Sequence, residues 1–470
     1  MAQNKAMVIG LGASGEACAK FLLKRGYEVV ATDTRAAPPG LARLAGESGF
    51  SFVGLERARE ALTGVLFAMI SPGISPYFSP AAPLCGELKR KGIELVGEIE
   101  LFARELKRLK DEHGYAPKVI GVTGTNGKTT TTSLTAKMAA QGGLFTIAAG
   151  NIGPNAVTEL DKALEAGRLP EVWVLELSSF QLETTHSLSC DSAAVLNVTQ
   201  DHIDWHGSFE AYARAKSRIF VPGTVRVLNR GDQVSLAMSD KSAACLTFGT
   251  DAPQQEGGYG LIEKDGAVWL CVFENGKTRA LLPVGSMKIR GRHNQMNALA
   301  ALALISGAGL SEEAALDALK EYKGEPHRVE FVASIGGVDY FDDGKGTNVG
   351  AVAAALEGLG SEGRKIVIIL GGDGKGQDFS GLRAPMDQYA RAAFMIGRDG
   401  RKIADQISSG KYPIQFCKDL PEAVRAARDA AEKGDAVLLS PACASWDMFP
   451  NYVVRSKLFT DTVLSFKKGD

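Results

Sequence analysis

The sequence predicts an α/β protein whose sheets are mostly parallel. Short apolar runs rich in β-branched residues recur along the whole chain, and each ends at a glycine or a polar turn. Many of these runs are separated by stretches rich in Ala, Leu, Glu and Arg with helical spacing. This alternation is typical of parallel sheets, in which ligands bind beyond the carboxyl ends of the strands. We therefore expect the functional residues directly after the apolar runs.

Nine segments are predicted to be buried strands. They are KAMVIGLG (5–12), YEVVATD (27–33), LFAMISPG (66–73), KVIGVTG (118–124), EVWVLELSS (171–179), SAAVLNVT (192–199), RKIVIILGGD (364–373), RAAFMIG (391–397) and DAVLLSPA (435–442). Residues 240–285 differ, because Asp-Gly and Asn-Gly pairs separate their short strands and favour tight hairpin turns. We expect a small antiparallel appendage there, and it carries no functional signal that we can identify.

Three domains are expected, at residues 1–98, 99–325 and 326–470. The first opens with a strand and a G-x-G-x-x-G turn, and a charged helical stretch over 98–117 leads into the second. Gly324 and Pro326 interrupt the helical pattern before the third domain, because proline cannot continue a helix.

The composition is that of a globular protein without an unusual charge. A net charge of -1 argues against nucleic acid and anionic membranes as partners. Seven scattered cysteines without a C-x-x-C pair argue against a disulfide framework and a structural zinc site. The chain starts with a strand pattern and not a signal peptide, and its most apolar run, 297–310, is too short to span a bilayer. We expect a reduced, cytoplasmic monomer.

The segment GVTGTNGKTT, residues 121–130, resembles a phosphate-binding loop with altered spacing. The usual loop, G-x-x-x-x-G-K-[ST], would place a glycine where this chain has Val122. Backbone N–H groups of such a turn and the following helix form an anion site, with Lys128 reaching the β/γ phosphates and Thr129 binding Mg²⁺. A glycine turn with a surface lysine is the alternative. The order of strand, turn, Lys-Thr and helix favours a nucleotide loop.

A magnesium site needs a carboxylate near this loop. Glu176 follows a predicted strand, and the next strand leads to Asp201, His202, Asp204 and His206. Taken alone, Glu176 can be a surface carboxylate and His202 a structural histidine, and His202 with His206 can form a zinc site. Together with the phosphate loop, a Mg²⁺ site is favoured.

A second glycine motif, GLGASG at Gly10 to Gly15, also follows a strand, and Asp33 ends the next one. By pattern this is a dinucleotide fingerprint and suggests an NAD(P)-dependent oxidoreductase. That interpretation leaves the 121–130 loop and Lys216 unexplained. A tight turn without a ligand is a third interpretation of GLGASG, and a nucleotide-switch module with slow ATPase activity is a further rival for the whole chain.

Nine blocks together resemble the Mur ligase family over essentially the whole chain. They are GVTGTNGKTT, LELSSFQLE, LNVTQDHIDWHG, YARAKSRIF, GRHNQMNALAA, GEPHRVEF, FDDGKGTNVGA, LGGDGKGQDF and LSPACASWDMF, in that order. The last four resemble the members that add D-glutamate, and G-x-x-G-x-x-G-K-T-T is the family's own form of the phosphate loop. The resemblance implies Rossmann-like first and third domains around a central P-loop-type ATPase domain.

The resemblance also implies a reaction in cytoplasmic peptidoglycan precursor synthesis. ATP would phosphorylate the carboxylate of UDP-N-acetylmuramoyl-L-alanine (UDP-MurNAc-L-Ala), and the amine of D-glutamate would attack the acyl phosphate. Amide, ADP and phosphate would result. Charge on both the phosphoryl and the carboxylate groups must be neutralised, which calls for Mg²⁺ and lysines. Other amino-acid ligases of the family and folylpolyglutamate synthase are the alternatives, and the third-domain blocks and the first domain argue against them.

The implied ATP residues span two domains. The phosphate cradle would be Gly124, Thr125, Asn126, Gly127, Lys128, Thr129 and Thr130, with Asn294 and Asn297 on the adenine side and Arg328 and Asp343 reaching in from the third domain. Thr129 and Glu176 would bind one Mg²⁺, and His202 with Lys216, as a carbamate derived from CO₂, would bind a second. Without the resemblance, Lys216 is a helix-surface lysine and the asparagines cap a helix. The implied catalytic residues are Lys128, His202, Lys216 and Lys345.

The implied precursor site lies in the first two domains. Its residues would be Ser14, Asp33, Thr34, Arg35, Ser71, Gly73, Asn151, Ser178, Gln181 and His202. The implied D-glutamate site would be Lys345, Thr347, Lys375, Ser445 and Tyr452, cations and hydroxyls suited to a dicarboxylate. Phenylalanine is the expected aromatic residue where this chain has Tyr452. Cys443 lacks a histidine base beside it and is expected to be a packed small residue.

Overall fold

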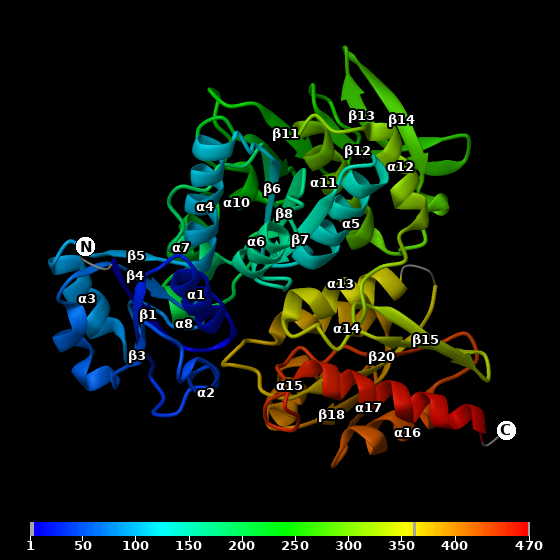
Figure 1. Cartoon of the computed structure of the whole chain (residues 1–470). Helices are drawn as coiled ribbons and strands as arrows, with labels where there is room; N and C mark the ends of the chain where they lie inside the picture. Colours follow the sequence, from blue (N-terminus) through cyan, green and yellow to red (C-terminus); the bar gives the residue numbers. More distant parts are fainter. Residues whose placement is uncertain (1–3, 361–362, 469–470) are drawn as a thin grey trace. The chain divides into compact units, whose positions relative to one another are not determined.

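Three β-sheets form the framework of the chain, as a computed structural model shows for residues 4–360 and 363–468 (Figure 1). The chain folds as two compact units. One contains Met1–Val284 and Asn297–Lys320, and the other contains Gly285–Met296 and Glu321–Asp470. The predicted α/β class with mostly parallel sheets is confirmed, and each of the nine predicted strands is present.

The first sheet lies in the first unit and has the order β3-β2-β1-β4-β5, with all neighbours parallel. Its strands are β1 (Lys5–Ile9), β2 (Glu28–Thr32), β3 (Phe50–Phe52), β4 (Val65–Ile70) and β5 (Glu94–Val96), and its helices are α1 (Ala13–Lys24), α2 (Leu41–Leu44) and α3 (Ala82–Arg90). The order reverses between β1 and β4, and ligands bind at such reversals in open parallel sheets. This is the predicted Rossmann-like arrangement.

The second sheet has the order β14-β13-β12-β11-β10-β9-β6-β8-β7. Its strands are β6 (Lys118–Thr123), β7 (Thr146–Gly150), β8 (Val172–Glu176), β9 (Ser192–Val195), β10 (Val225–Asn229), β11 (Cys245–Phe248), β12 (Gly258–Lys264), β13 (Ala267–Glu274) and β14 (Lys277–Pro283). Seven helices of the same unit are α4 (Glu98–His113), α5 (Lys128–Gln141), α6 (Ala156–Glu165), α7 (Ser179–Glu183), α8 (Ile203–His206), α9 (Phe209–Ser217) and α10 (Gln233–Leu236).

The antiparallel component predicted for residues 240–285 continues this second sheet. Strands β11 and β12 join in parallel, whereas β13 pairs antiparallel with both β12 and β14. The hairpin turns are Asp265-Gly266 and Asn275-Gly276, and each pair has φ values of 52° and 73°. Positive φ at both central positions is the geometry that Asp-Gly and Asn-Gly pairs favour, which explains why these turns were predictable.

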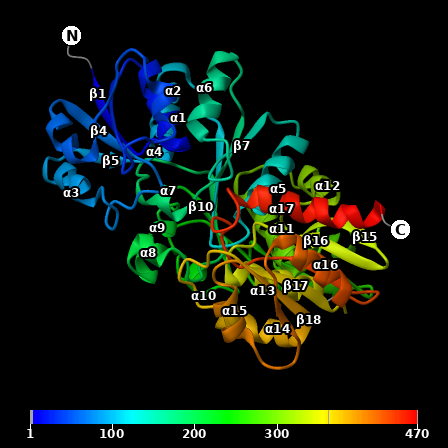
Figure 2. The same ribbon diagram turned by 90° about the horizontal axis from the view of Figure 1, so that it is seen from below.

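The third sheet belongs to the second unit and has the order β15-β16-β20-β17-β18-β19, with only β15 antiparallel. Its strands are β15 (Glu330–Ile335), β16 (Val338–Asp342), β17 (Ile366–Gly371), β18 (Ala390–Ile396), β19 (Ile414–Phe416) and β20 (Ala436–Leu439). The remaining α-helices are α11 (Arg292–Gly307), α12 (Glu312–Glu321), α13 (Val349–Gly360), α14 (Arg383–Tyr389), α15 (Gly400–Ile407), α16 (Leu420–Ala430) and α17 (Tyr452–Ser465). Helices α16 and α17 pack side by side (Figure 2).

The central strands are apolar on both faces, as expected of strands covered by helices on two sides. In β17, Ile366 and Ile368 belong to one core cluster, whereas Val367 and Ile369 belong to another. Two buried layers therefore flank the sheet, and polar groups collect at the strand ends. Across the described ranges, 4–360 and 363–468, we find no helix with both the length and the apolar character needed to cross a membrane.

Candidate active site

The predicted phosphate loop connects β6 to α5. Val122 lies inside β6, where it pairs with Glu176 of β8 and Ala194 of β9, so the loop itself starts at Gly124. Gly124 and Gly127 have φ values of 154° and 83°, which L side chains rarely adopt. The missing glycine at position 122 is therefore a strand residue, and the glycines that the turn requires are present.

Lys128 begins α5 and folds back over this loop. Its Nζ donates hydrogen bonds to the carbonyl oxygens of Gly124 and Thr125, each at 2.8 Å. A Cβ atom on Gly127 would lie 2.5 Å from Oδ1 of Asn297, so this predicted adenine-side residue packs against the loop. Thr129 and Thr130 are buried in the first turn of α5. The loop backbone, the Lys128 side chain and the N-terminus of α5 thus lie together, as a phosphate-binding site requires.

Two residues that the sequence did not single out fix the loop. Asn197 accepts a hydrogen bond from the Asn126 N–H at 2.8 Å and donates to the Asn126 carbonyl at 3.0 Å. The Tyr212 hydroxyl lies 2.9 Å from Oγ1 of Thr125. These contacts come from segments about 71 and 87 residues further along the chain, and no local pattern marks them.

Glu176 ends β8 beside the loop and is 2% exposed. Its Oε1 accepts a hydrogen bond from Nδ2 of Asn151 at 2.6 Å. Its Oε2 is buried and has no hydrogen-bond partner among the described residues. A buried carboxylate oxygen without a partner is costly unless a cation binds it, so the donor set at this point suits Mg²⁺.

Lys216 of α9 is buried, at 1% exposure, although the residue pattern alone suggested a surface position. Its Nζ donates to the Gly124 carbonyl at 2.9 Å and lies 4.5 Å from the centre of the Tyr212 ring. Burial, and after it the neighbouring charge of Lys128, lower the pKa of Lys216 well below its usual value. Burial therefore favours the unprotonated form of this amine beside the phosphate loop.

His202 and His206 lie in an aromatic cluster. The ring of His202 is 4.6 Å from that of Phe180, and its backbone has a left-handed φ of 52°. Nε2 of His206 lies 3.0 Å from the hydroxyl of Ser179, and burial lowers the pKa of His206 to about 4. This contact occupies the outer nitrogen of His206, which does not favour a zinc site shared with His202.

The N-terminal glycine turn follows β1, where the first sheet reverses. Ser71 donates to the Gly10 carbonyl at 2.8 Å, closing the turn, and the exposed Gly73 follows two residues later. Ser14 lies in the first turn of α1. The backbone that carries these predicted precursor residues is thus assembled at one edge of the sheet.

Asp33 is turned inward. Its Oδ2 accepts from the Leu11 N–H at 2.6 Å, and Arg35 donates to both carboxylate oxygens at 2.8 Å. Burial alone would raise the pKa of Asp33, but the hydrogen bonds from Arg35 and Leu11 hold it below its usual value. The acid that would hold a ribose in a dinucleotide fold is therefore engaged internally, whereas the neighbouring Thr34 is exposed.

Ser178 and Gln181 form a capping box at the start of α7. The Gln181 N–H donates to Oγ of Ser178 at 3.2 Å, and the Ser178 N–H donates to Oε1 of Gln181 at 3.0 Å. Nε2 of Gln181 makes a long contact of 3.5 Å with Oε2 of Glu98, a buried acid that the sequence did not indicate. Burial raises the pKa of Glu98 to about 7.

This raised pKa predicts a pH effect on stability. The folded protein binds a proton at Glu98 more tightly than the unfolded chain, so this stabilisation is complete below about pH 4.5 and is lost as pH rises through about 7. The shift corresponds to roughly 3 kcal/mol at most. We expect the melting temperature of the wild type, relative to Glu98→Gln, to fall between pH 5 and pH 8. A difference that stays constant with pH would contradict this.

In the second unit, the predicted D-glutamate residues follow β16, β17 and β20 or begin α17. Nζ of Lys345 lies 5.6 Å from the Tyr452 ring centre, and Nζ of Lys375 lies 5.3 Å from that of Trp446. Ser445 is buried after β20. Backbone hydrogen bonds tie the three loops together, from Gly371 to Pro441, from Asp373 to Ala444 and from Ala442 to Gly346. Cations and hydroxyls are thereby held at one sheet edge.

Two further residues brace these loops and were missed by the sequence analysis. Gln377 donates from Nε2 to the carbonyls of Thr347 at 3.3 Å and Gly374 at 3.1 Å. Buried Arg455 donates to the carbonyls of Gly344 at 3.0 Å and Cys443 at 3.1 Å. Burial lowers the pKa of Arg455 to about 10, and it raises the pKa of the Cys443 thiol to about 12, as expected of a packed residue.

Arg328 lies between two residues with left-handed backbones, His327 (φ 62°) and Val329 (φ 48°). Asp343 is buried and accepts from the Ser440 hydroxyl at 2.6 Å. Burial raises the pKa of Asp343 to about 7, although Ser440 and Arg328 oppose this effect. Asn294, the other predicted adenine-side residue, donates from Nδ2 to the Arg290 carbonyl at 2.8 Å.

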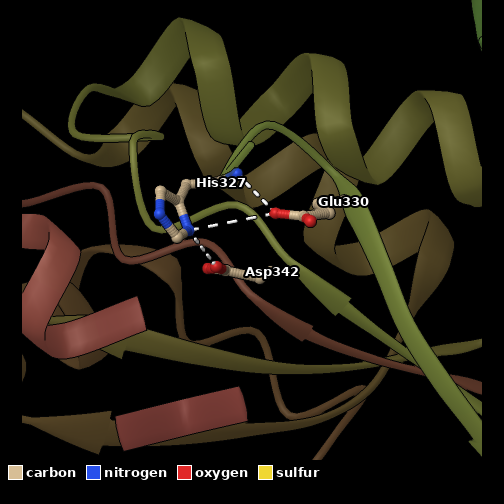
Figure 3. A group of neighbouring side chains, drawn as sticks. All are labelled: His327, Glu330 and Asp342. Carbon is tan, nitrogen blue, oxygen red and sulfur yellow. Dashed lines mark hydrogen bonds and ion pairs between the residues drawn. The ribbon is translucent and has the colours of Figure 1, made fainter. Parts of the chain in front are cut away.

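His327, Glu330 and Asp342 form the one group of three metal-type ligands in the described residues (Figure 3). Nδ1 of His327 lies 2.7 Å from Oδ2 of Asp342, and the His327 N–H donates to Oε2 of Glu330 at 2.8 Å. Oδ1 of Asp342 accepts from Ser456 and from the Gly344 N–H, each at 2.9 Å. Because these side chains form hydrogen bonds with one another, we interpret the group as a structural support for the strained backbone of residues 327–329.

Three family models match this chain. The Mur ligase MurD-like N-terminal domain matches residues 4–97, the Mur ligase middle domain matches 122–305, and the Mur ligase glutamate ligase domain matches 327–443. The UDP-N-acetylmuramoylalanine–D-glutamate ligase of Cupriavidus pinatubonensis is 48% identical, over 98% of this chain and 97% of the relative. The enzyme of the same name from Ralstonia nicotianae is 47% identical, over 97% and 96%.

Solved structures share the fold. UDP-N-acetylmuramate-alanine ligase MurC from Thermotoga maritima matches with a TM-score of 0.61 at 21% identity, over 98% of this chain and 99% of that one. MurF from Acinetobacter baumannii matches with a TM-score of 0.61 at 16% identity, over 97% and 93%. Three domain matches and near full-length relatives thus lead to one conclusion: the chain belongs to the Mur ligase family.

Proposed function

We propose that the protein is an ATP-dependent ligase that joins D-glutamate to UDP-MurNAc-L-Ala in peptidoglycan precursor synthesis. The observation that carries this proposal is the near full-length match, at 45–48% identity, to relatives named for that reaction. The protein forms a C–N bond and releases ADP. We further propose a cytoplasmic monomer, with functional domains at 1–98, 99–325 and 326–470.

ATP would bind with its phosphates in the loop from Gly124 to Thr130. Lys128 supplies the cation, and the α5 N-terminus supplies backbone donors. Asn294 and Asn297 would hold the adenine, and Arg328 and Asp343 would reach the nucleotide from the third domain. The packing of Asn297 against Gly127 supports its part in this assignment.

Thr129, Glu176, His202 and the carbamate of Lys216 would hold two Mg²⁺ ions. Bound Mg²⁺ neutralises developing phosphate charge. The unpartnered oxygen of Glu176 supports this assignment. The lowered pKa of buried Lys216 supports carbamate formation, because only an unprotonated amine attacks CO₂. The new N–C bond converts a neutral side chain into an anion and releases one proton.

The reaction proceeds by transfer of the γ-phosphoryl group to the carboxylate of UDP-MurNAc-L-Ala. The D-glutamate amine then attacks the acyl carbon, and phosphate leaves as the amide forms. The precursor would be held by Ser14, Asp33, Thr34, Arg35, Ser71, Gly73, Asn151, Ser178, Gln181 and His202. The hydrogen bond between Asn151 and Glu176 supports a direct link between the precursor and magnesium sites.

Lys345, Thr347, Lys375, Ser445 and Tyr452 would bind D-glutamate. We expect Lys375→Ala to raise the KM for D-glutamate by about tenfold or more, because a charge-assisted hydrogen bond to a carboxylate is lost. The KM for ATP should change little. Lys457→Ala is the control, because Lys457 is exposed on α17 and pairs with Asp461, which is also exposed. Equal changes in both KM values would contradict the assignment.

The function is tested by incubating the protein with ATP, Mg²⁺, UDP-MurNAc-L-Ala and either D- or L-glutamate. Phosphate release and product mass are followed together. Product with the D-isomer alone supports the proposal, whereas phosphate release that ignores both isomers would point to another amino-acid ligase. Tight NAD(P) binding without turnover would favour the oxidoreductase alternative, against which the inward-facing carboxylate of Asp33 argues.

A further inference from the structure

Helix α6 begins at an asparagine that does not cap it. Asn155 occupies the N-cap position with extended backbone angles (φ −60°, ψ 140°), yet its side chain makes no hydrogen bond to its own helix. Asparagine is among the preferred N-cap residues because its Oδ1 normally accepts from the first backbone N–H groups. This side chain therefore has a different partner.

That partner is Ser14, at the start of α1. Oγ of Ser14 donates to Oδ1 of Asn155 at 3.3 Å, across 141 residues of sequence. Helices α1 and α6 pack against each other within the first unit, and each is at least ten residues long. The side chain of Asn155 thus lies beside the residue to which we assign the diphosphate of the nucleotide precursor.

Glu98 performs the capping that Asn155 omits. Its Oε1 accepts from the Val157 N–H of α6 at 3.0 Å, although Glu98 belongs to α4. The carboxylate is 1% exposed, so this contact is not shared with bulk solvent. Its second oxygen lies 3.5 Å from Nε2 of Gln181, which we assign to the other end of the same precursor. One buried side chain therefore touches two elements of the precursor site.

We propose that Glu98 is a positioning residue whose capping of α6 releases Asn155 to bind the precursor diphosphate together with Ser14. The proposal rests on the function proposed above and adds two residues to the site. Nδ2 of Asn155 supplies the donor to a phosphoryl oxygen, and the first turns of α1 and α6 add to the local positive potential. Thr34 and Arg35 at the uracil end would be unaffected.

Asn155→Asp separates binding from structure. Aspartate caps a helix as well as asparagine does, and its charge is favourable at a helix N-terminus, so α6 should stay intact. It has no donor, however, and its charge repels a diphosphate. We expect calorimetric titration with UDP-MurNAc-L-Ala to show binding about tenfold weaker or more, with an unchanged melting temperature. Asn155→Ala should weaken binding in the same direction.

Glu98→Leu removes the oxygen that accepts from the Val157 N–H, so it should raise the KM for the precursor while leaving the KM for ATP and for D-glutamate unchanged. The control for Asn155→Asp is Asn275→Asp, which adds the same charge at an exposed hairpin turn. If Asn155→Asp bound UDP-MurNAc-L-Ala as tightly as the wild type does, the proposal would be overturned and Asn155 would be a structural residue. A wild-type protein that neither binds nor converts the precursor would instead refute the proposed function, so the two failures are distinguishable.

Discussion

Replacing Lys128 with alanine is expected to lower kcat for ligation by about 10³-fold or more, since charge on the transferring phosphoryl group is then left uncompensated. The helix should survive, because alanine is the best helix former and Lys128 is the first residue of α5. Phosphate release and dipeptide product are measured together, and the melting temperature is recorded for both proteins. A large loss of activity with a small change in melting temperature is the expected pattern.

Lys107→Ala is the matched control for this experiment. Lys107 is exposed on α4, and its removal should change stability by no more than about 0.5 kcal/mol. If Lys128→Ala kept activity within tenfold of the wild type, the 124–130 loop would not be the phosphate site. If the inactive Lys128→Ala variant still bound ATP tightly, Lys128 would act in the chemical step and not in nucleotide affinity.

The framework of this site was predictable from sequence because it depends on local patterns. Buried parallel strands are continuous apolar runs, and the residues that follow them mark the ligand edge of the sheet. Gly124 and Lys128 were predicted from the loop motif that follows one such run, and Glu176 was predicted from its position after the next. Strands such as β7 and β16 were missed because TIAAG and VDYFD do not form strong apolar runs.

The bracing residues were not predictable, because their contacts depend on which strands become neighbours. Asn197 reaches the phosphate loop only because β9 lies beside β6. Arg455 reaches Gly344 and Cys443 only because β20 lies beside β16. Hydrogen bonds to backbone carbonyls require no particular sequence at the acceptor, so neither end carries a pattern. The burial of Lys216 was hidden for the same reason, since α9 alone suggests a surface lysine.

Replacing Lys216 with methionine is expected to lower kcat by about 10²-fold or more, with little loss of stability. Methionine fills a similar volume, and removing a buried ionisable group can be neutral or stabilising when the replacement packs well. The hydrogen bond from Nζ to the Gly124 carbonyl is lost, which costs roughly 1 kcal/mol. Activity should therefore fall strongly while the melting temperature changes little. An active Lys216→Met variant would contradict a catalytic role.

The carbamate on Lys216 is tested separately from the amine. If the carbamate is the working group, activity should fall when CO₂ and bicarbonate are removed and return when they are restored, because carbamate formation is reversible. Incubation with ¹³C-bicarbonate should give a carbamate signal in the wild type that Lys216→Met lacks. Activity that does not depend on CO₂ would mean that Lys216 acts as an amine beside the Gly124 carbonyl and not as a carbamate. The second magnesium site would then need a different anionic ligand.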